Sequence, residues 1–379
     1  MNTEKMTYAD TGVNYAGLDP GKNRSQFAAA TTDGNIRRFG FEVLSWSRGE
    51  SCFLVKTPLG FLGFVIEGLG TKSLVADKYR IAVAKYVIAL ALGQASCPSF
   101  YDKLAQCNVA MAVNDLITLG ALPFIYGQYL AVQSDEWCSD QARLDDLING
   151  TVRACNLARC TWGPGETPAL NSIIVPDTDD LAGATVGIVK GEPFNPVNIE
   201  HGDAIVVIES SGIHANGLTL ARKIADKLPE GYLTKLSDGR TYGETLLDPT
   251  HIYVGLVEDC LDIGVNIHYA VNITGHGWRK FMRATQPFTY TIHTLPTQLP
   301  IFDFLQKHGP LDDLEAYGNL NMGAGFALYM KEKHAWQVIE VAACLGLKAF
   351  VAGNIETGDK KVVIKPKGLE YAGETLAVR

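Results

Sequence analysis

The sequence predicts an α/β protein of two domains, and three observations carry that prediction. Segments with the apolar spacing of strands alternate with segments that have the spacing of helices in both halves of the chain. The 379 residues exceed one average domain of roughly 150 residues. A polar segment with two prolines, residues 191–196, divides the chain, and the pattern restarts after it. We therefore expect an N-terminal domain over residues 1–192 and a C-terminal domain over residues 193–379.

The apolar pattern of the N-terminal half predicts a β-hairpin followed by further strands and helices. Residues 1–35 are polar and turn-rich, so we expect an arm over the first domain. Two short apolar runs flank a Pro-Leu-Gly turn, which is typical of a β-hairpin. The expected strands cover residues 51–57, 60–66, 123–132 and 181–189, and the expected helices cover 78–93, 106–120 and 139–155. We expect a loop at the Gly-Pro-Gly of residues 163–165.

The C-terminal half repeats the alternation. A strand over residues 204–209, a loop over 210–216 and a helix over 217–227 open it. Further helices are expected over 242–261, 302–308 and 335–345, and further strands over 326–330, 348–352 and 361–364. This second series supports a separate α/β unit.

Composition and charge narrow the class of protein. The net charge of −8 argues against a protein that coats nucleic acid. The eight cysteines contain no C-x-x-C pair, so we expect free thiols in a cytoplasmic protein rather than a zinc site. No apolar run approaches about 18 residues, and the first residues contain no long apolar segment, so neither a membrane span nor a signal peptide is expected.

Glycine and histidine are used unevenly. Glycine supplies 38 of the 379 residues without a collagen period, which favours turns and ligand loops. All eight histidines lie at or after His201. A metal site built from the first half alone must therefore use carboxylates or cysteines.

The first candidate site lies where the strand over residues 60–66 ends. Glu67 is followed there by Gly68, Gly70, Thr71 and Lys72. Glycines let the backbone approach an anion, and a carboxylate, a hydroxyl and an ammonium together suit a nucleotide phosphate with Mg²⁺. The spacing is not that of a Walker A loop, and an ordinary strand-to-helix turn is the alternative.

Two further carboxylates favour a metal site. Asp115, next to Asn114, lies in an apolar helical segment, where a carboxylate is unfavourable unless it is paired or bound to a metal. Glu166 lies in the glycine-containing loop between Gly165 and Thr167. Separated acids without a nearby histidine indicate Mg²⁺ rather than zinc. A salt bridge for Asp115 and a solvated loop position for Glu166 are the alternatives.

Three loops of the second half are candidates for the substrate side. Ser210, Ser211 and Gly212 lie between a strand and a helix, an arrangement that suits an anion. His214 in the same loop is a candidate phosphate ligand or general acid/base, unless its place there is incidental. Residues 272–278 form either a ligand loop or a turn anchored by Trp278, and residues 321–326 have a close-packing pattern.

These motifs, in their order, resemble the phosphoribosylformylglycinamidine cyclo-ligase, or AIR synthetase, family. The segment ending Val-Asn-Asp-Leu resembles the metal-and-nucleotide helix of the family, and Ser-Ser-Gly-Ile-His-Ala-Asn-Gly resembles its S-S-G-x-H-S-N-G. The matching segments are residues 8–13, 68–72, 109–116, 165–167, 180–189, 210–217, 247–253, 274–275 and 321–323. The resemblance spans nearly the whole chain.

The resemblance implies a fold, a partner and a reaction. The fold is a two-domain PurM-like fold of α+β or α/β kind, in which the N-terminal domains of a homodimer share a β-barrel and each C-terminal domain is α/β. The reaction is the ATP-dependent closure of formylglycinamidine ribonucleotide, a small phosphoribosyl substrate, to aminoimidazole ribonucleotide in purine biosynthesis. ATP would phosphorylate the formamide oxygen, and an internal nitrogen would then displace phosphate.

The resemblance also implies the roles of individual residues. Asp115, His214 and Lys72 would be catalytic, and Glu67, Asp115 and Glu166 would hold Mg²⁺. The residues that would bind ATP are Glu67, Gly68, Gly70, Thr71, Lys72, Asn114, Asp115, Gly165, Glu166 and Thr167. The residues that would bind the substrate are Ser210, Ser211, Gly212, His214, Asn216, Asn272, Thr274 and Gly275.

Some positions differ from the family pattern. Glu67 stands where the family has Asp, Pro168 alters the loop after Glu166, and Asn272 stands where the family has His. His276 occupies a glycine position of the family, and Lys22 is a possible counterpart of its early lysine. Two other functions therefore stay open: an ATP-dependent enzyme for another amide or phosphate substrate, and a non-catalytic nucleotide-binding dimer.

Overall fold

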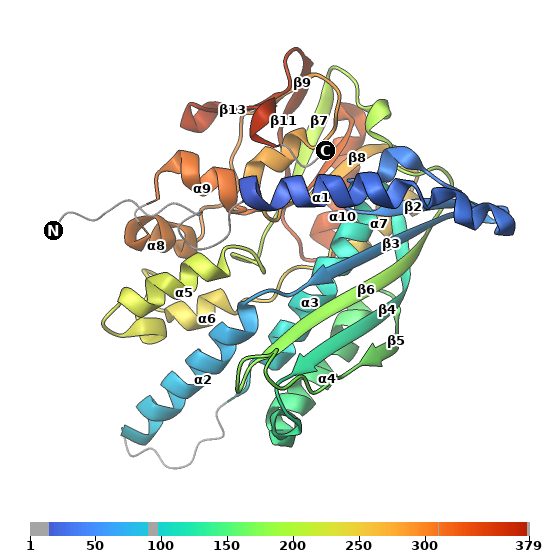
Figure 1. Ribbon diagram of the computed structural model, residues 1–379. Helices are drawn as coiled ribbons and strands as arrows, with labels where there is room; N and C mark the ends of the chain where they lie inside the picture. Colours follow the sequence, from blue (N-terminus) through green and yellow to red (C-terminus); the bar gives the residue numbers. More distant parts are fainter. Residues whose placement is uncertain (1–14, 90–97, 310, 377–379) are drawn as a thin grey trace.

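Two largely antiparallel sheets organise the chain (Figure 1). A computed structural model of the protein describes residues 15–89, 98–309 and 311–376. The first sheet has the order β1-β2-β3-β6-β4-β5, and only β4 and β5 pair in parallel. Its strands are β1 (Glu42–Val43), β2 (Phe53–Thr57), β3 (Gly60–Gly68), β4 (Ala121–Val132), β5 (Thr161–Glu166) and β6 (Asp179–Val189).

The second sheet has the order β13-β12-β9-β11-β7-β10-β8, with β9 and β12 as its parallel pair. Its strands are β7 (Asp203–Glu209), β8 (Ile267–Asn272), β9 (Phe288–Ile292), β10 (Ala324–Lys331), β11 (Ala349–Thr357), β12 (Lys361–Ile364) and β13 (Leu369–Ala372). Because antiparallel neighbours dominate both sheets, the fold is α+β. The α/β interpretation of the alternating pattern was wrong in this respect, since alternation along the chain does not fix strand direction.

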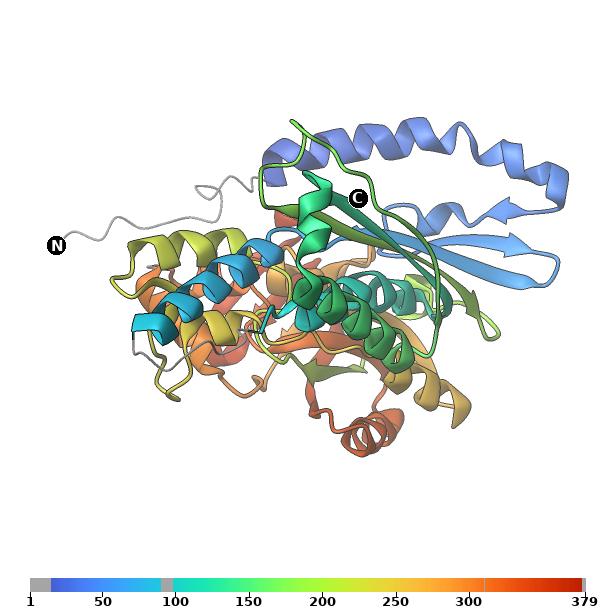
Figure 2. The same ribbon diagram turned by 90° about the horizontal axis from the view of Figure 1, so that it is seen from below.

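Helices α3 (Tyr101–Leu116) and α4 (Gln141–Leu157) cover one face of the first sheet (Figures 1 and 2). Gly63 and Gly187 permit this packing, because a Cβ atom on either would lie 3.0 Å or less from the side chain of Leu116. The sheet is open in the described chain, with β1 and β5 at its edges. A single chain therefore contains no closed barrel among its described residues.

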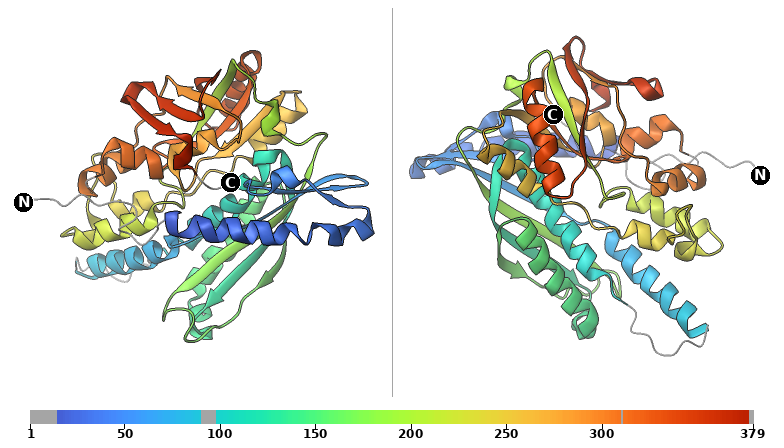
Figure 3. Two further views of the ribbon diagram at one scale, coloured as in Figure 1. Left: turned by 45° about the horizontal axis from the view of Figure 1, so that its top comes forward. Right: turned by 180° about the vertical axis from the view of Figure 1, so that it is seen from behind.

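Strand β7 lies inside the second sheet, and its apolar run Ala-Ile-Val-Val-Ile is buried on both faces. Helices α7 (Val254–Asp262) and α10 (Glu332–Cys344) pack on one of these faces (Figure 3). The remaining helices of this half are α5 (Leu218–Lys227), α6 (Tyr242–Leu246), α8 (Pro300–His308) and α9 (Asp313–Asn319). No helix among the described residues is long and apolar enough to cross a membrane.

Helix α2 (Lys72–Ala89) belongs to the first half of the sequence but packs against α5 and α6 of the second half (Figure 1). Gly243 allows the close approach of α6, because a Cβ atom there would lie 2.2 Å from the ring of Tyr79. The two sequence halves are thus interlocked through α2.

Several elements differ from their predictions. Residues 15–30 form helix α1 (Tyr15–Ala30), with Pro20 inside it, rather than a turn-rich arm; Figure 2 shows it standing along the outside of the first sheet. The helix expected over 242–261 is two helices, α6 and α7, because Pro249 lies between them. The expected loop at residues 163–165 is strand β5. The 8–13 motif and the end of the helix expected over 78–93 lie outside the described residues.

A buried carboxylate pair joins α2, α3 and the start of β6. The hydroxyl of Tyr101 donates to Asp179 Oδ1 at 2.6 Å and also lies 3.1 Å from Asp77 Oδ2, and Arg143 lies 3.5 Å from Asp77. Burial, and then the charge of Asp179, raises the pKa of Asp77 to about 6. Burial also raises the pKa of Asp179.

We predict that this pair makes stability fall as pH rises. The folded-state pKa of Asp77 lies above the unfolded value of about 3.9, so its contribution to stability is present below about pH 4 and is lost as pH rises through about 6. Between pH 4 and pH 7, Asp77→Asn should gain on the order of 2 kcal/mol in unfolding free energy relative to wild type. Denaturant titrations at both pH values measure this.

The matched control is Asp226→Asn, because Asp226 is an exposed carboxylate paired with Lys78 on the outside of α2. It removes a carboxylate from the same region of the fold without touching the Asp77 and Asp179 pair. A pH-independent difference for Asp77→Asn would contradict the inferred titration of the pair.

Candidate functional site

A cavity of about 340 Å³ lies where the first sheet, helix α3 and the loops of the second half meet. Its volume is in the range of small-molecule sites. One wall comes from Glu67 at the end of β3 and from Met111 and Asp115 on α3. A second wall, which we call the basic wall, comes from residues 274–276, from Lys280 in the 3₁₀ helix that follows them, and from Arg283 directly after that helix.

The acidic wall brings Glu67 and Asp115 together. Asp115 is only 5% exposed, and its Oδ1 accepts a hydrogen bond of 2.7 Å from Asn272 Nδ2. Burial, and then the charge of Asp115, raises the pKa of Glu67 to about 7. Two carboxylates in one buried wall thus oppose each other's charge, which is the situation that a bound cation relieves.

The basic wall carries Lys280 and Arg283. Lys280 is 7% exposed and donates to Thr274 Oγ1 at 2.6 Å. The Nε of Arg283 donates to Glu50 Oε2 at 3.1 Å, and the hydroxyl of Tyr269 donates to the same oxygen at 2.7 Å. Burial, and then the charge of Arg283, lowers the pKa of Lys280 to about 8. The cavity lining therefore combines carboxylates with buried cations.

Helix α1 contributes Lys22 and Gln26 to the lining of the cavity. Asp19 of the same helix lies close to the cavity, with its Oδ2 3.5 Å from His276 Nε2. Burial, and then the charges of Lys280 and Arg279, lowers the pKa of His276 to about 4, so its ring is neutral near pH 7. Lys22 lies 3.3 Å from Asp19 on the same helix.

The residues present fit a magnesium ion and a phosphorylated ligand. Mg²⁺ is commonly held by one or two carboxylates together with ligand phosphates, and Glu67 and Asp115 supply two. Among the described residues, no group of three or more His, Cys, Asp or Glu side chains has the arrangement of a complete metal site. Asn216 lines the cavity, and its buried Nδ2 has no hydrogen-bond partner among the described residues, which is unusual for a buried polar group.

Lys72 lies outside this cavity. Its side chain is fully buried, and its ammonium donates to His214 O and Asp248 O at 2.8 Å each and to Cys107 Sγ at 3.1 Å. These three acceptors use all three of its protons. The structure therefore gives Lys72 a bridging position between the two halves, and it brings no support for a phosphate ligand or a catalytic role there.

The Ser-Ser-Gly loop is engaged with the protein. Ser211 Oγ donates to Pro249 O at 2.6 Å, and Ser210 Oγ donates to Asn321 Oδ1 at 3.2 Å. His214 is 1% exposed, and burial, followed by the charges of His251 and Lys72, keeps its pKa well below the usual range. Of the expected substrate residues, Asn216, Thr274 and Gly275 line the cavity.

Asn114 ties α3 to the segment between α6 and α7. Its Nδ2 donates to His251 O at 2.8 Å, and its Oδ1 accepts from Tyr253 N at 2.9 Å. It therefore orients the neighbouring Asp115 rather than facing the cavity.

Glu166 lies apart from the carboxylate pair. It is exposed on β5, in the cross-strand row that contains Tyr129, Ala182 and Gly68. Glu67 belongs to the adjacent row, whose side chains point to the other face of the sheet. Three strand spacings also separate β3 from β5, about 14 Å. One chain therefore does not bring Glu166, or its neighbours Gly165 and Thr167, to the cavity.

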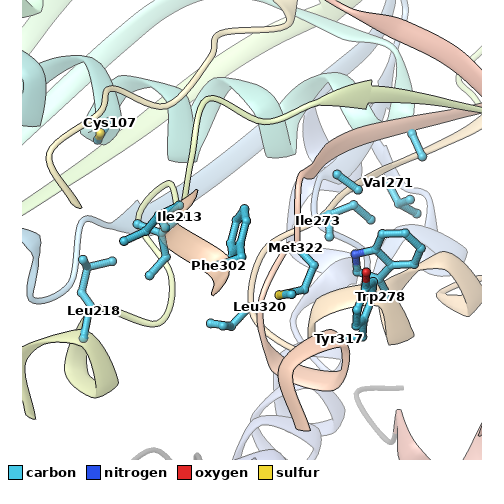
Figure 4. Close-up of a cluster of buried hydrophobic side chains, with 14 of the residues drawn as sticks. Cys107, Ile213, Leu218, Val271, Ile273, Trp278, Phe302, Tyr317, Leu320 and Met322 are labelled. Atoms are coloured by element: carbon cyan, nitrogen blue, oxygen red, sulfur yellow. The ribbon is translucent and has the colours of Figure 1, made fainter. Parts of the chain in front are cut away.

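The sequence allowed two interpretations of residues 272–278, a ligand loop or a turn anchored by Trp278, and the structure has features of both. Thr274 and Gly275 line the cavity, while Trp278 points away and packs against Tyr317 in the buried cluster drawn in Figure 4. The indole of Trp278 donates to Asn321 O at 2.7 Å, which joins this loop to the 321–323 turn.

Several cavity residues were not found from the sequence. Glu50, Lys280 and Arg283 had no assigned role, although the basic residues directly follow the Thr-Gly-His-Gly loop. That adjacency is the signal that could have identified them.

Comparisons with known proteins match both halves of the chain. Residues 66–189 match the family model of the AIR synthase related protein, N-terminal domain, and residues 200–365 match the model of its C-terminal domain. Two solved structures share the fold. That of tt0281 from Thermus thermophilus has a TM-score of 0.51 and 15% sequence identity, and the match covers 84% of this chain and 90% of that one. That of AaThiL complexed with AMPPCP and TMP has a TM-score of 0.54 and 14% sequence identity, and the match covers 86% of this chain and 90% of that one.

Curated relatives match over nearly the full length. The phosphoribosylformylglycinamidine cyclo-ligase of Carboxydothermus hydrogenoformans is 32% identical over 95% of this chain and 99% of its own. That of Methanococcoides burtonii is 30% identical over 96% of this chain and 100% of its own. The chain belongs to the AIR synthase family, together with these cyclo-ligases.

Proposed function

We propose that the protein is an ATP-dependent phosphoribosylformylglycinamidine cyclo-ligase that acts in the cavity between Glu67, Asp115 and Lys280. The observation that carries this proposal is a cavity that combines carboxylates with buried cations, in a chain whose full-length relatives bear that name. The two kinds of charge match the two needs of the reaction, a cation with a triphosphate and an anionic substrate.

In the proposed reaction the formamide oxygen of formylglycinamidine ribonucleotide attacks the γ-phosphorus of ATP, and ADP leaves. An internal nitrogen then forms a bond to the activated carbon, the C–O bond breaks, and phosphate leaves with the oxygen. Glu67 and Asp115 would hold Mg²⁺, which neutralises charge on the triphosphate when bound. The chain's own contribution is positioning: Asn216 and Thr274 face the substrate, and the buried walls exclude water.

The test is a coupled assay of the purified protein with Mg²⁺ and ATP. ADP should appear only with formylglycinamidine ribonucleotide present, and in equal amount to aminoimidazole ribonucleotide. ATP binding without this turnover would reject the proposal. ADP release with a different amide or phosphate substrate would favour the alternative suggested by Asn272 and His276, which lie at the acidic and the basic wall respectively.

We predict that Asp115→Asn weakens Mg·ATP binding roughly 10- to 100-fold, because it removes a charged ligand. Thermal stability should change little, because the Oδ1 of an asparagine at this position can still accept the hydrogen bond from Asn272 Nδ2. Isothermal titration calorimetry and thermal unfolding measure the two effects. The control is Asp145→Asn, an exposed carboxylate on α4. Lost stability with unchanged Mg·ATP affinity would contradict the ligand role.

The proposal also includes a homodimer in which two first sheets form a shared β-barrel. Support comes from the sheet face that α3 and α4 leave uncovered. Phe64 and Ile66 on β3, Tyr129 on β4 and Ile188 on β6 expose apolar side chains there, Ile66 to 70%. A contiguous apolar face of this kind is typical of an interface.

Ile66→Glu should therefore convert the dimer to a monomer, because it would bury an unpaired charge at the interface. Light scattering at micromolar concentration measures the mass. Leu59→Glu, in the exposed turn between β2 and β3, is the control and should leave the dimer intact. A dimeric Ile66→Glu variant, or a monomeric wild type, would contradict the assigned face.

The domain boundary at residues 192 and 193 and a cytoplasmic location complete the proposal. The boundary is supported by the two sheets, which use residues 42–189 and 203–372. The location is supported by the cysteines, since all seven within the described residues are free thiols.

A further inference from the structure

Within the described part of the chain, Lys280 differs from the other cations of the cavity because it has no ion pair. Arg283 is bonded to Glu50, and Lys22 lies 3.3 Å from Asp19. Among the described residues, no carboxylate oxygen lies within 4.0 Å of the Lys280 ammonium, whose single hydrogen-bond partner is Thr274 Oγ1. A buried ammonium with two unused protons is unfavourable unless something else compensates it.

Two carboxylates compensate the ammonium without bonding to it. Asp115 and Glu67 line the same cavity, and their charges favour the charged form of Lys280. A divalent cation at those carboxylates would cancel their charge and leave the ammonium without a counter-charge. An anion that reaches Lys280 would restore the balance, so binding of the cation and of the anion should be coupled.

The rest of the basic wall is ready for such an anion. Lys280 lines the cavity, and Thr274 fixes the direction of its ammonium. Asn216 lines the same cavity with a buried amide donor that has no partner. Lys280 and Asn216 thus belong to the lining of one cavity, and an ammonium and an amide are groups that can recognise an oxyanion.

We propose that Lys280 binds a phosphoryl oxyanion of the ligand directly, with Thr274 as its positioning residue, and that it does so when a divalent cation occupies the Glu67 and Asp115 wall. This inference rests on the proposed function only in taking phosphorylated ligands as those of the cavity. The phosphoryl group belongs either to the nucleotide or to the phosphoribosyl substrate, which share this chemistry.

The experiment measures binding by calorimetry for wild type and Lys280→Met. The two probes are β,γ-methylene ATP and ribose 5-phosphate, each with Mg²⁺ and with EDTA; adenosine and ribose serve as probes without phosphate. Lys280→Met should weaken one phosphorylated probe roughly 10- to 100-fold in Mg²⁺, because it removes a charge-assisted hydrogen bond. A loss confined to the ATP analogue assigns the triphosphate, and a loss confined to ribose 5-phosphate assigns the substrate.

Two further variants keep the result interpretable. Lys333→Met, an exposed lysine on α10, is the matched control and should bind all probes as wild type does. Thr274→Val keeps the ammonium but removes its positioning bond, so it should weaken the same probe by a smaller factor. It also provides the test if Lys280→Met does not fold.

The proposal is overturned if folded variants bind both phosphorylated probes as wild type does, or if adenosine and ribose weaken equally. These binding measurements need no turnover, so their failure can be distinguished from a failure of the proposed cyclo-ligase activity. Lys280-dependent binding without formation of aminoimidazole ribonucleotide would reject the cyclo-ligase alone, and turnover with unchanged binding would reject the role of Lys280 alone.

Discussion

The relative placement of the two halves depends on one buried ammonium. Lys72, at the start of α2, reaches a carbonyl in the Ser-Ser-Gly loop, a carbonyl before α7 and the thiol of Cys107 on α3. A fully buried charge is tolerated only when its hydrogen bonds are complete, and here they are. Three segments from different parts of the sequence must therefore meet at Lys72, and α3 is held in the position from which Asp115 faces the cavity.

The cavity follows from that junction. Its carboxylates come from the first half, on β3 and α3, and its buried cations come from the second half, after β8. Glu50, bonded to Arg283, adds a further carboxylate beside the cations. Brought together, the walls form a site that suits a cation and an anion at the same time, which is what phosphoryl transfer requires of a protein.

The sequence singled out Glu67 and Asp115 among the residues of the cavity but neither Lys280 nor Arg283, for physical reasons. A carboxylate in an apolar helix has few explanations, so Asp115 stood out, and Glu67 stood at a strand end with glycines. Lys280 lies between Trp278 and Phe281, whose apolar pattern indicates core packing. The ammonium of Lys72 is chemically suited to bind a phosphate, but sequence spacing does not show which acceptors a long side chain reaches.

Fold predictions succeeded where periodicity was strong and failed where one residue decides the outcome. The β2–β3 hairpin, α3 and β7 follow their apolar patterns. Pro249 ends a helical segment that the apolar pattern alone would continue. The pairing register of β5, a strand rich in Gly and Pro, places Glu166 on the face of the sheet away from Glu67. Strand direction in both sheets is set by tertiary pairing, which local sequence does not encode.

A crystal of the protein with Mn²⁺ and β,γ-methylene ATP tests the central claim most directly. Anomalous scattering should place one metal at a ligand distance of about 2.2 Å from carboxylate oxygens of both Glu67 and Asp115, with analogue phosphates completing the shell. A metal bound away from both residues would contradict the assignment of the cavity as the cation and nucleotide site.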